Sequence, residues 1–403
     1  MKVLHVIPTF APAWGWGGPV RAAFELTREQ VRQGHQVTVF TTNADVSGVL
    51  NVPVNEAVDR DGVEIWYSCI RPPKKLAFSP GLARCLRSQI DRFDIIHLHA
   101  LFSWPPTIAA IWAEFRHIPY IVRPAGSLDP VCIAKTYDTR LESVLSRVKK
   151  WMYFKTVAHL VLDSAAAIHY TTEEERHAAQ DLRLRAPAIV VPLGVNFTCD
   201  DSRPNSTYVK QKEAHPRTKT ILYLSRLDPI KGLEELIDAV SILSTKRNDF
   251  LLRIVGDGPP AYRNKLLDAV TRSPAASRIT FVGPLFGEHK WQEMREADIF
   301  VLTSHHENFG IAVVEAMANG LPVIVSNCVN ISKEIESSQA GLVTSVEPHH
   351  IATALDKLLE SDQLRKEMGR CGRELVTTHY SWESVVKSLT AAYENIIKLN
   401  RQM

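Results

Sequence analysis

The chain has 403 residues, of which 45% are hydrophobic and 23% are charged. This length exceeds what one ordinary hydrophobic core supports and indicates two domains of roughly 200 residues each. The formal net charge of +3 is small and argues against a nucleic-acid partner, since nucleic-acid-binding domains normally carry a clustered basic face.

The six cysteines are scattered along the chain without a CxxC spacing. The sequence therefore indicates neither a zinc site nor a disulfide framework, and it is typical of a reducing compartment. No uninterrupted apolar stretch approaches the roughly 18 to 20 residues that a membrane span requires. We expect a cytoplasmic protein that is soluble, or at most peripheral at the inner face of the membrane.

Short apolar runs alternate with amphipathic segments along the whole chain. Continuously apolar runs such as 299–302 are typical of strands buried on both faces, and therefore of parallel sheets covered by helices. Strands are expected at 3–7, 36–42, 63–68, 94–99, 119–123, 159–162, 188–192, 220–225, 250–255, 279–283, 298–303, 322–326 and 341–346. Helices are expected at 19–33, 80–91, 103–116, 138–156, 232–246, 261–272, 287–296, 311–319 and 348–378. This alternation predicts an α/β fold of two doubly wound, Rossmann-like domains.

The periodic pattern stops in a polar, irregular segment from Asn196 to about Thr218, as is typical of a linker. We therefore expect an N-terminal domain at 1–195 and a C-terminal domain at 196–380. Open α/β sheets bind ligands at the carboxyl ends of their strands. Two such domains facing each other would place the active site in the cleft between them.

The segment 304–322 combines two carboxylates with a turn and a short helix. Free N–H groups at the start of that helix, near Gly310, form an anion site suited to a diphosphate. Glu307 lies in the turn and Glu315 within the helix, so the two can reach different ends of one ligand. On spacing alone, a dipole-favoured acidic residue and a solvated glutamate explain the pattern about equally well.

Two cations, Arg226 and Lys231, follow the strand expected at 220–225. They lie at its carboxyl end, and a guanidinium fork with a mobile ammonium suits the oxygens of a diphosphate. The plainer interpretation is a pair of solvated surface cations.

Glu307 and Glu315, followed by Ala-Met-Ala-Asn-Gly-Leu-Pro-Val, resemble the EX7E signature of the family-4 retaining glycosyltransferases, or group 1 glycosyltransferases. The similarity covers nearly the whole chain and is strongest from about 220 to 345. It implies the GT-B fold, with an acceptor-binding N-terminal domain and a C-terminal domain that binds the nucleotide sugar. It also implies that a last helix, at 381–400, packs back onto the first domain.

The resemblance implies roles for individual residues. Glu307 would contact sugar hydroxyls, Glu315 would bind the ribose diol, and Arg226 with Lys231 would clamp the diphosphate. Val282 would lie where members of the family bind the nucleotide base, but the residue types at 281–283 do not distinguish uracil from guanine. We count as catalytic His99, Arg226, Lys231 and Glu307, and as donor-binding Gly17, Gly18, Gly256, Val282, Asn308, Phe309, Gly310, Ile311 and Glu315.

The site residues expected in the N-terminal domain come from a glycine loop and a pair of histidines. Gly17 and Gly18 resemble the family's Gly-Gly loop beside the diphosphate and acceptor, and glycines let a backbone approach a ligand closely. His97 and His99 end one strand and point to one face, which could suggest a metal pair. No carboxylate or cysteine at matching spacing completes a ligand set, and His99 matches the family's strand-end histidine beside the transferred sugar. The loop 123–130 is expected to shape acceptor binding.

Two other motifs are weaker. Asp59-Arg60-Asp61 is formally a DxD, the metal motif of the other major glycosyltransferase fold, but it stands alone and we interpret it as a turn. The segment 147–155 mixes cations with aromatics, so it suits either peripheral contact with anionic lipid or a half-buried helix with a solvated basic side. We expect no metal and no cofactor besides the donor substrate.

The expected function is a metal-independent, retaining transfer of a hexosyl unit from a nucleoside-diphosphate sugar to an acceptor hydroxyl. The acceptor would be a glycan or a lipid-linked molecule, in polysaccharide, glycolipid or cell-envelope glycan synthesis. Two alternatives stay open. One is a sugar-nucleotide epimerase, which would need acid and base groups around the sugar; the other is a catalytically silent sugar-nucleotide-binding module.

Overall fold

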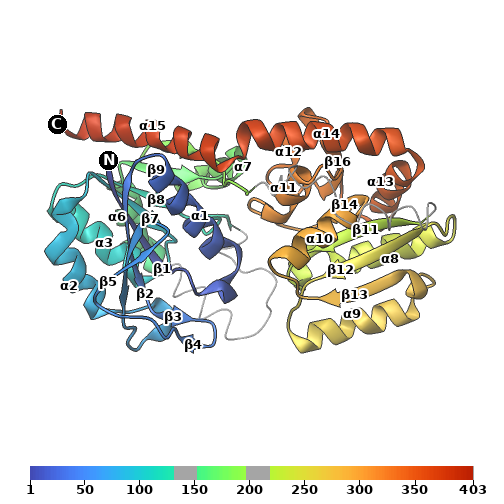
Figure 1. Cartoon of the computed structure of the whole chain (residues 1–403), viewed down its shortest axis with the longest axis horizontal. Coiled ribbons are helices and arrows are strands. Elements are labelled where there is room, and N and C mark those ends of the chain that lie inside the picture. The colour runs from blue at the N-terminus through green and yellow to red at the C-terminus, as the bar shows by residue number, and fades with distance from the viewer. Residues whose placement is uncertain (131–151, 197–217, 403) are drawn as a thin grey trace. The chain divides into compact units, whose positions relative to one another are not determined.

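The computed structural model describes residues 1–130, 152–196 and 218–402. The chain divides into two compact units, one formed by Met1–Gly194 with Trp382–Met403 and the other by Val195–Ser381. Each unit contains a predominantly parallel sheet with helices packed on it (Figure 1). The linker expected at 197–217 lies outside the described residues.

The sheet of the first unit has the strand order β10-β9-β8-β7-β1-β2-β6-β5. Its strands are β1 (Lys2–Thr9), β2 (Gln36–Thr42), β5 (Ala57–Arg60), β6 (Val63–Ser68), β7 (Ile95–His99), β8 (Tyr120–Arg123), β9 (Ala167–Tyr170) and β10 (Ala188–Val190). A separate small pair is formed by β3 (Ala44–Asp45) and β4 (Gly48–Val49). Because β1 lies between β2 and β7, the winding direction reverses there, which is where doubly wound sheets bind ligands.

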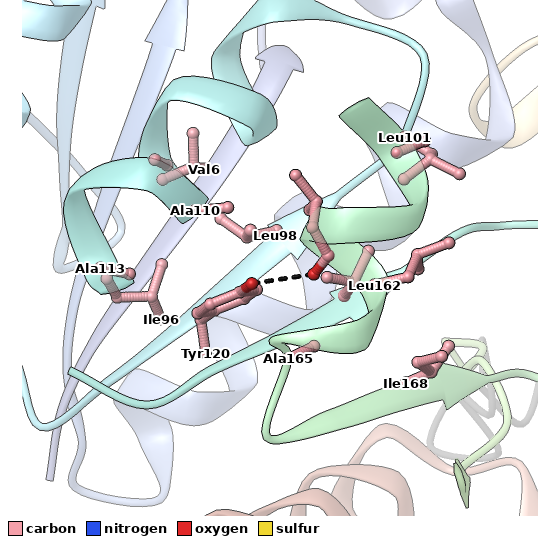
Figure 2. Packing of buried hydrophobic residues seen from close by; sticks show 14 of the residues in the cluster. Val6, Ile96, Leu98, Leu101, Ala110, Ala113, Tyr120, Leu162, Ala165 and Ile168 are labelled. Carbon is pink, nitrogen blue, oxygen red and sulfur yellow. Dashed lines mark hydrogen bonds between the residues drawn. The ribbon is translucent and has the colours of Figure 1, made fainter. Parts of the chain in front are cut away.

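One face of this sheet is packed with apolar side chains. Successive residues of a strand point to opposite faces, so Ile96 and Leu98 of β7 lie on the same side as Val6 of β1. Figure 2 shows these side chains against Ala110 and Ala113 of α3 (Trp104–Phe115). Tyr120 belongs to the same cluster, and its hydroxyl donates to the Val161 carbonyl over 2.8 Å. This apolar cluster lies between the sheet and the helices α2 (Pro80–Gln89), α3 and α6 (His159–Asp163), and a second cluster includes Ala23 and Phe24 of α1 (Gly18–Arg32).

Two long helices from opposite ends of the chain pack together in this unit. They are α1 (Gly18–Arg32), which has Pro19 in its first turn, and α15 (Trp382–Asn400). The buried residues of α15 follow a helical spacing of three and four, namely Trp382, Val385, Val386, Leu389, Tyr393 and Ile396. The loop after α1 is tied to α15 by a bond of 3.0 Å between the His35 ring and the Thr390 hydroxyl.

The second unit has a six-stranded parallel sheet in the order β13-β12-β11-β14-β15-β16. Its strands are β11 (Lys219–Leu224), β12 (Phe250–Val255), β13 (Ile279–Gly283), β14 (Ile299–Leu302), β15 (Val323–Ser326) and β16 (Gly341–Thr344). Its helices are α8 (Leu233–Ser244), α9 (Pro260–Arg272), α10 (Glu288–Glu296), α11 (Ile311–Ala318), α12 (Ser332–Ser337), α13 (Pro348–Glu360) and α14 (Asp362–His379). In chain order the strands run 3-2-1-4-5-6, the order of a Rossmann sheet, with the switch point between β11 and β14.

Three expectations about local structure are wrong. The strand expected at 159–162 is the helix α6, and the strand lies at β9 instead, because a short apolar run does not distinguish a buried helix from a strand. The helix expected at 348–378 is two helices, since the Ser361 side chain caps α14 by accepting from Leu364 N over 3.1 Å. Asp59 and Arg60 belong to the antiparallel edge strand β5, and only Asp61 lies in the turn.

The segment 147–155 is described only from Met152 onward. Phe154 is buried in the apolar cluster of the first unit, and Tyr153 packs against it. These two aromatic side chains therefore pack inward, and a membrane contact by this segment stays a prediction. Within the described ranges, no helix has the length and apolar character needed to cross a membrane.

Candidate active site

The loops that follow β11 and β14 are held against each other at the switch point of the second sheet. Gly232 has a φ of 64°, and a Cβ added to it would lie 1.9 Å from the Thr303 carbonyl oxygen. The Thr303 hydroxyl donates to the Gly232 carbonyl over 2.9 Å, and His305 N donates to the Ile230 carbonyl over 2.8 Å. Glycine is therefore required here by the close approach of two backbones.

This contact brings Lys231 and Glu307 together. Lys231 Nζ lies 2.6 Å from Glu307 Oε2, and the two side chains are only 12% and 19% exposed. Lys231 ends a 3-10 turn that Asp228 caps by accepting from Ile230 N. The backbone of Glu307 is fixed by a parallel bridge to Val329. Both side chains are thus positioned by the folding of their loops.

Arg226 lies at the same end of β11 but is exposed. Its loop packs on the turn that contains Gly256, because Leu227 N donates to the Asp257 carbonyl over 2.9 Å. Gly256 has a φ of 149°, and a Cβ there would lie 1.8 Å from the Ser225 carbonyl oxygen. The close approach of the neighbouring loop therefore explains the glycine at this position, and the glycine by itself is no evidence for a bound ligand.

The residues between the two glutamates form a turn and the start of a helix. Gly310 has a φ of 79° and immediately precedes α11, and its carbonyl accepts from Val313 N over 2.8 Å. Phe309 is buried edge-to-face against Tyr380, with ring centroids 5.7 Å apart. Asn308 and Ile311 are half-buried. The turn is therefore anchored by Phe309, while Asn308 and Ile311 keep partial exposure.

Glu315, within α11, has a partner that the sequence analysis did not find. Lys290 Nζ of α10 lies 2.5 Å from Glu315 Oε1, and these side chains are 16% and 15% exposed. The same ammonium lies 4.2 Å from the centroid of the Trp291 ring, close enough for a cation–π contact. Each of the two glutamates is thus paired with its own lysine. Val282 lies half-buried in the edge strand β13.

In the first unit, the predicted site residues lie after β1 and at the end of β7, the two strands at its switch point. Gly17 has a φ of 74° and a Cβ on it would meet no atom within 4 Å, so its backbone angle alone favours glycine. Gly18 begins α1. His99 is the last residue of β7 and is 2% exposed.

His99 belongs to a row of buried polar residues across one face of this sheet. His5 of β1 pairs in register with His97 of β7, and His99 pairs with Arg123 of β8. His169 of β9 is bonded to His97, with 3.3 Å between Nδ1 and Nε2. All five side chains are at most 2% exposed. Gln30 of α1 and Tyr393 of α15 contact this row, through His5 at 2.7 Å and His97 at 2.7 Å.

Burial keeps these rings neutral. It lowers the pKa of His5 to about 4 and that of His169 to about 3, and it holds the pKa of His97 and His99 well below the usual range. Burial also lowers the pKa of Arg123 to about 10, which leaves this guanidinium charged at neutral pH.

The structure adds a third histidine to the pair considered for metal binding. Nitrogen atoms of His5, His97 and His99 lie within 4.8 Å of one another, a spacing that could hold an ion. However, His5 Nδ1 and His99 Nε2 are hydrogen-bonded to each other at 2.8 Å, and the charge of Arg123 opposes a cation beside them. We therefore assign these nitrogens to hydrogen bonding. His5 interrupts the apolar strand 3–7, and a buried polar residue there was the signal that sequence reasoning could have used.

Comparison with known families gives matches over both units. The model described as "Glycosyl transferase 4-like domain" matches residues 17–194, and the model "Glycosyl transferases group 1" matches residues 205–375. A D-inositol 3-phosphate glycosyltransferase of Corynebacterium glutamicum is 25% identical, covering 98% of this chain and 96% of the relative. A phosphatidyl-myo-inositol mannosyltransferase of Mycobacterium leprae is 29% identical, covering 94% of this chain and 93% of the relative.

Solved structures match the fold over the same extent. Sucrose-phosphate synthase from Thermosynechococcus elongatus has a TM-score of 0.75 at 18% identity, covering 99% of this chain and 100% of that one. The Anabaena protein HepE in complex with UDP and glucose has a TM-score of 0.72 at 17% identity, covering 98% of this chain and 100% of that one. The chain therefore belongs to the group 1, family-4 glycosyltransferases and has their GT-B fold.

Proposed function

We propose that this glycosyltransferase moves a hexosyl unit from a nucleoside-diphosphate sugar to an acceptor hydroxyl, with retained anomeric configuration and without a divalent metal ion. The observation that carries the proposal is the meeting of Lys231 with Glu307 at the switch point of the second sheet, with Arg226 at the same end of β11. Cations there fit a diphosphate, and a carboxylate fits the hydroxyls of the attached sugar.

In the proposed reaction the bond between the anomeric carbon and the diphosphate oxygen breaks, and a bond to the acceptor oxygen forms. Arg226, Lys231 and the helix start at Gly310 stabilise the negative charge that develops on the leaving diphosphate. The acceptor proton passes to an oxygen of that leaving group, on the same face of the sugar. This route accounts for retention and needs no protein nucleophile.

The donor is assigned to the second unit and the acceptor to the first. Glu315 is proposed to bind the ribose diol, with Val282 beside the base and Gly256, Asn308, Phe309, Gly310 and Ile311 lining the donor. Gly17, Gly18 and His99 are proposed to face the diphosphate and the transferred sugar. The substrates named for the two inositol-related relatives support a hydroxyl acceptor that is phosphorylated or lipid-linked, in glycolipid, polysaccharide or cell-envelope glycan synthesis.

The test is a thermal-shift screen with UDP, GDP and ADP, followed by their sugars. The nucleotide that stabilises the protein then selects the labelled donor for incubation with candidate acceptors, with and without EDTA. We expect a glycoside whose anomeric configuration, read by NMR, matches the donor, at a rate that EDTA leaves unchanged. An isomerised donor formed without acceptor would instead identify an epimerase. Binding without turnover across all acceptors would identify a silent module, and an inverted product or activity restored only by Mg²⁺ or Mn²⁺ would overturn the proposed mechanism.

A further inference from the structure

The donors and acceptors of the buried polar row in the first unit can be assigned one after another, starting from a backbone carbonyl. His169 Nε2 lies 2.7 Å from the Val191 carbonyl oxygen, which can only accept, so Nε2 carries the proton. Because the ring is neutral, His169 Nδ1 accepts from His97 Nε2. His97 Nδ1 is then an acceptor, and the Tyr393 hydroxyl donates to it over 2.7 Å. This branch is therefore directed from Tyr393 to Val191.

A second branch fixes the tautomer of His99. His5 Nε2 lies 2.7 Å from Gln30 Oε1, an amide carbonyl that can only accept, so His5 Nε2 carries the proton. The neutral His5 ring therefore accepts at Nδ1, and the donor is His99 Nε2 at 2.8 Å. Since His99 is also neutral, its Nδ1 keeps an unprotonated lone pair.

The Gln30 amide contacts His5 through its oxygen. Gln30 Oε1 accepts from His5 Nε2 over 2.7 Å, while Gln30 Nε2 is buried without a hydrogen-bond partner among the described residues.

The direction of the second branch leaves an acceptor on β7 and donors on the neighbouring strand β8 without partners among the described residues. His99 Nδ1 is buried without a hydrogen-bond partner among the described residues, and so are Arg123 Nε and Nη1. His99 and Arg123 are in-register neighbours on β7 and β8, so both side chains lie on the same face of the sheet. A hydroxyl group can donate to Nδ1 while it accepts from the guanidinium, whereas an ionised carboxylate cannot donate to Nδ1.

We propose that Gln30 and His5 are positioning residues that hold His99 protonated at Nε2, so that Nδ1 accepts a hydrogen bond from a hydroxyl group of the transferred sugar. The choice of sugar as the source of that hydroxyl rests on the proposed function. The direction of the hydrogen bonds rests on the described contacts and on the neutrality of the buried rings, and it is independent of the substrate. Two measurements separate these parts.

The first measurement needs no substrate. In the full-length protein labelled with ¹⁵N-histidine, long-range ¹H–¹⁵N spectra at pH 7.5 distinguish a protonated ring nitrogen from a bare one, and His99→Gln assigns the signals. We expect His99 to be protonated at Nε2 and bare at Nδ1, with His5 in the same tautomer. A His99 ring that is protonated at Nδ1, or at both nitrogens, would overturn the proposal.

The second measurement uses a matched pair of variants. Gln30→Glu keeps an oxygen acceptor for His5 and should keep the tautomer of His99. Gln30→Met removes that acceptor, so the tautomers of His5 and His99 should no longer be fixed. We expect Gln30→Met to lower kcat/KM for transfer by roughly tenfold, the usual effect of one hydrogen bond, and Gln30→Glu to rescue most of that loss. Affinity for the free nucleoside diphosphate should stay unchanged in both, because this ligand carries no transferred sugar.

Thr27→Val serves as the control, because Thr27 is buried on α1 and, within the described part of the chain, its hydroxyl bonds only to the Phe24 carbonyl of its own helix. An equal loss of transfer in Gln30→Glu, Gln30→Met and Thr27→Val would show a structural role for α1 and overturn the positioning role. A wild-type protein that binds no nucleotide would overturn the proposed function and the sugar as partner. The ring-nitrogen spectra would still decide the direction of the hydrogen bonds.

Discussion

Lys231 Nζ lies 2.6 Å from Glu307 Oε2, so the residue proposed to hold the diphosphate and the residue proposed to hold the sugar are bonded to each other. The loops after β11 and β14, which carry these two residues, are held together where Gly232 meets Thr303. Lys231 therefore differs from Arg226, which is exposed at the same end of β11.

This difference predicts unequal effects of two alanine substitutions. Arg226→Ala should change the free energy of unfolding by less than about 0.5 kcal/mol, because exposed cations contribute little to folding. Lys231→Ala should cost about 1–3 kcal/mol, because it leaves a mostly buried carboxylate without its partner. Both variants should bind a nucleoside diphosphate more weakly. Urea unfolding and calorimetric titration check the two expectations. An unchanged nucleotide affinity in the variant that combines both substitutions would contradict the proposed diphosphate clamp.

Lys290 provides a prediction about the other glutamate. Its ammonium is paired with one carboxylate oxygen of Glu315, and we propose that the other oxygen binds the ribose diol. Lys290→Met should therefore weaken free nucleotide and sugar nucleotide by the same factor, on the order of tenfold for one charge-assisted bond. It should weaken a 2′-deoxynucleotide less, because that ligand lacks one of the hydroxyls.

Lys265→Met is the matched control, since Lys265 forms a more exposed pair with Glu234 on the surface of the same unit. Equal losses for ribo- and deoxyribonucleotides in Lys290→Met would contradict a role at the ribose. A loss of the same size in Lys265→Met would point to general electrostatics.

The buried histidines predict a dependence of stability on pH. An unfolded histidine has a pKa near 6.5, whereas burial lowers the pKa of His5 to about 4 and that of His169 to about 3 in the folded protein. Between these values the unfolded chain binds protons that the folded chain does not. The contribution of each ring is therefore fully present above pH 6.5 and falls as the pH drops toward 4, by up to about 1.4 kcal/mol per pH unit.

Urea unfolding at pH 7.5, 6 and 5 measures this slope. His169→Gln should flatten it, because one of the titrating rings is removed, while a surface variant such as His349→Gln should leave it unchanged. A wild-type free energy of unfolding that is constant from pH 7.5 to pH 5 would be inconsistent with neutral, buried rings.

The α/β class of two doubly wound domains followed from the sequence because continuous apolar strands and intervening helices are local patterns, whereas the GT-B fold was implied by the family resemblance. The order of the strands was not predicted, because it depends on pairings between distant segments. Glu315 was expected within a helix from a local pattern, and it lies in α11. Lys290 was not found, because only the packing of α10 beside α11 brings its side chain to Glu315, and nothing in the charged segment 288–296 marks it.

The histidine row shows the same limit. The alternation of β7 predicts that His97 and His99 share a face, which the register with β1 and β8 confirms. Their partners Gln30 and Tyr393 lie in helices near opposite ends of the chain, and no local pattern connects them. Long-range polar contacts of this kind depend on the complete fold.

The most direct test of the central claim is calorimetric titration of the wild type, Glu307→Gln and Glu315→Gln with the selected nucleoside diphosphate and with its sugar. Glu315→Gln should weaken both ligands, because both carry the ribose. Glu307→Gln should leave the free nucleotide unaffected and weaken the sugar nucleotide by about 10- to 150-fold, the cost of roughly 1.5–3 kcal/mol for one charge-assisted hydrogen bond. Equal weakening of both ligands by Glu307→Gln would contradict the separate roles of Glu307 at the sugar and Glu315 at the ribose. Unchanged affinities in both variants would contradict the proposed donor site itself.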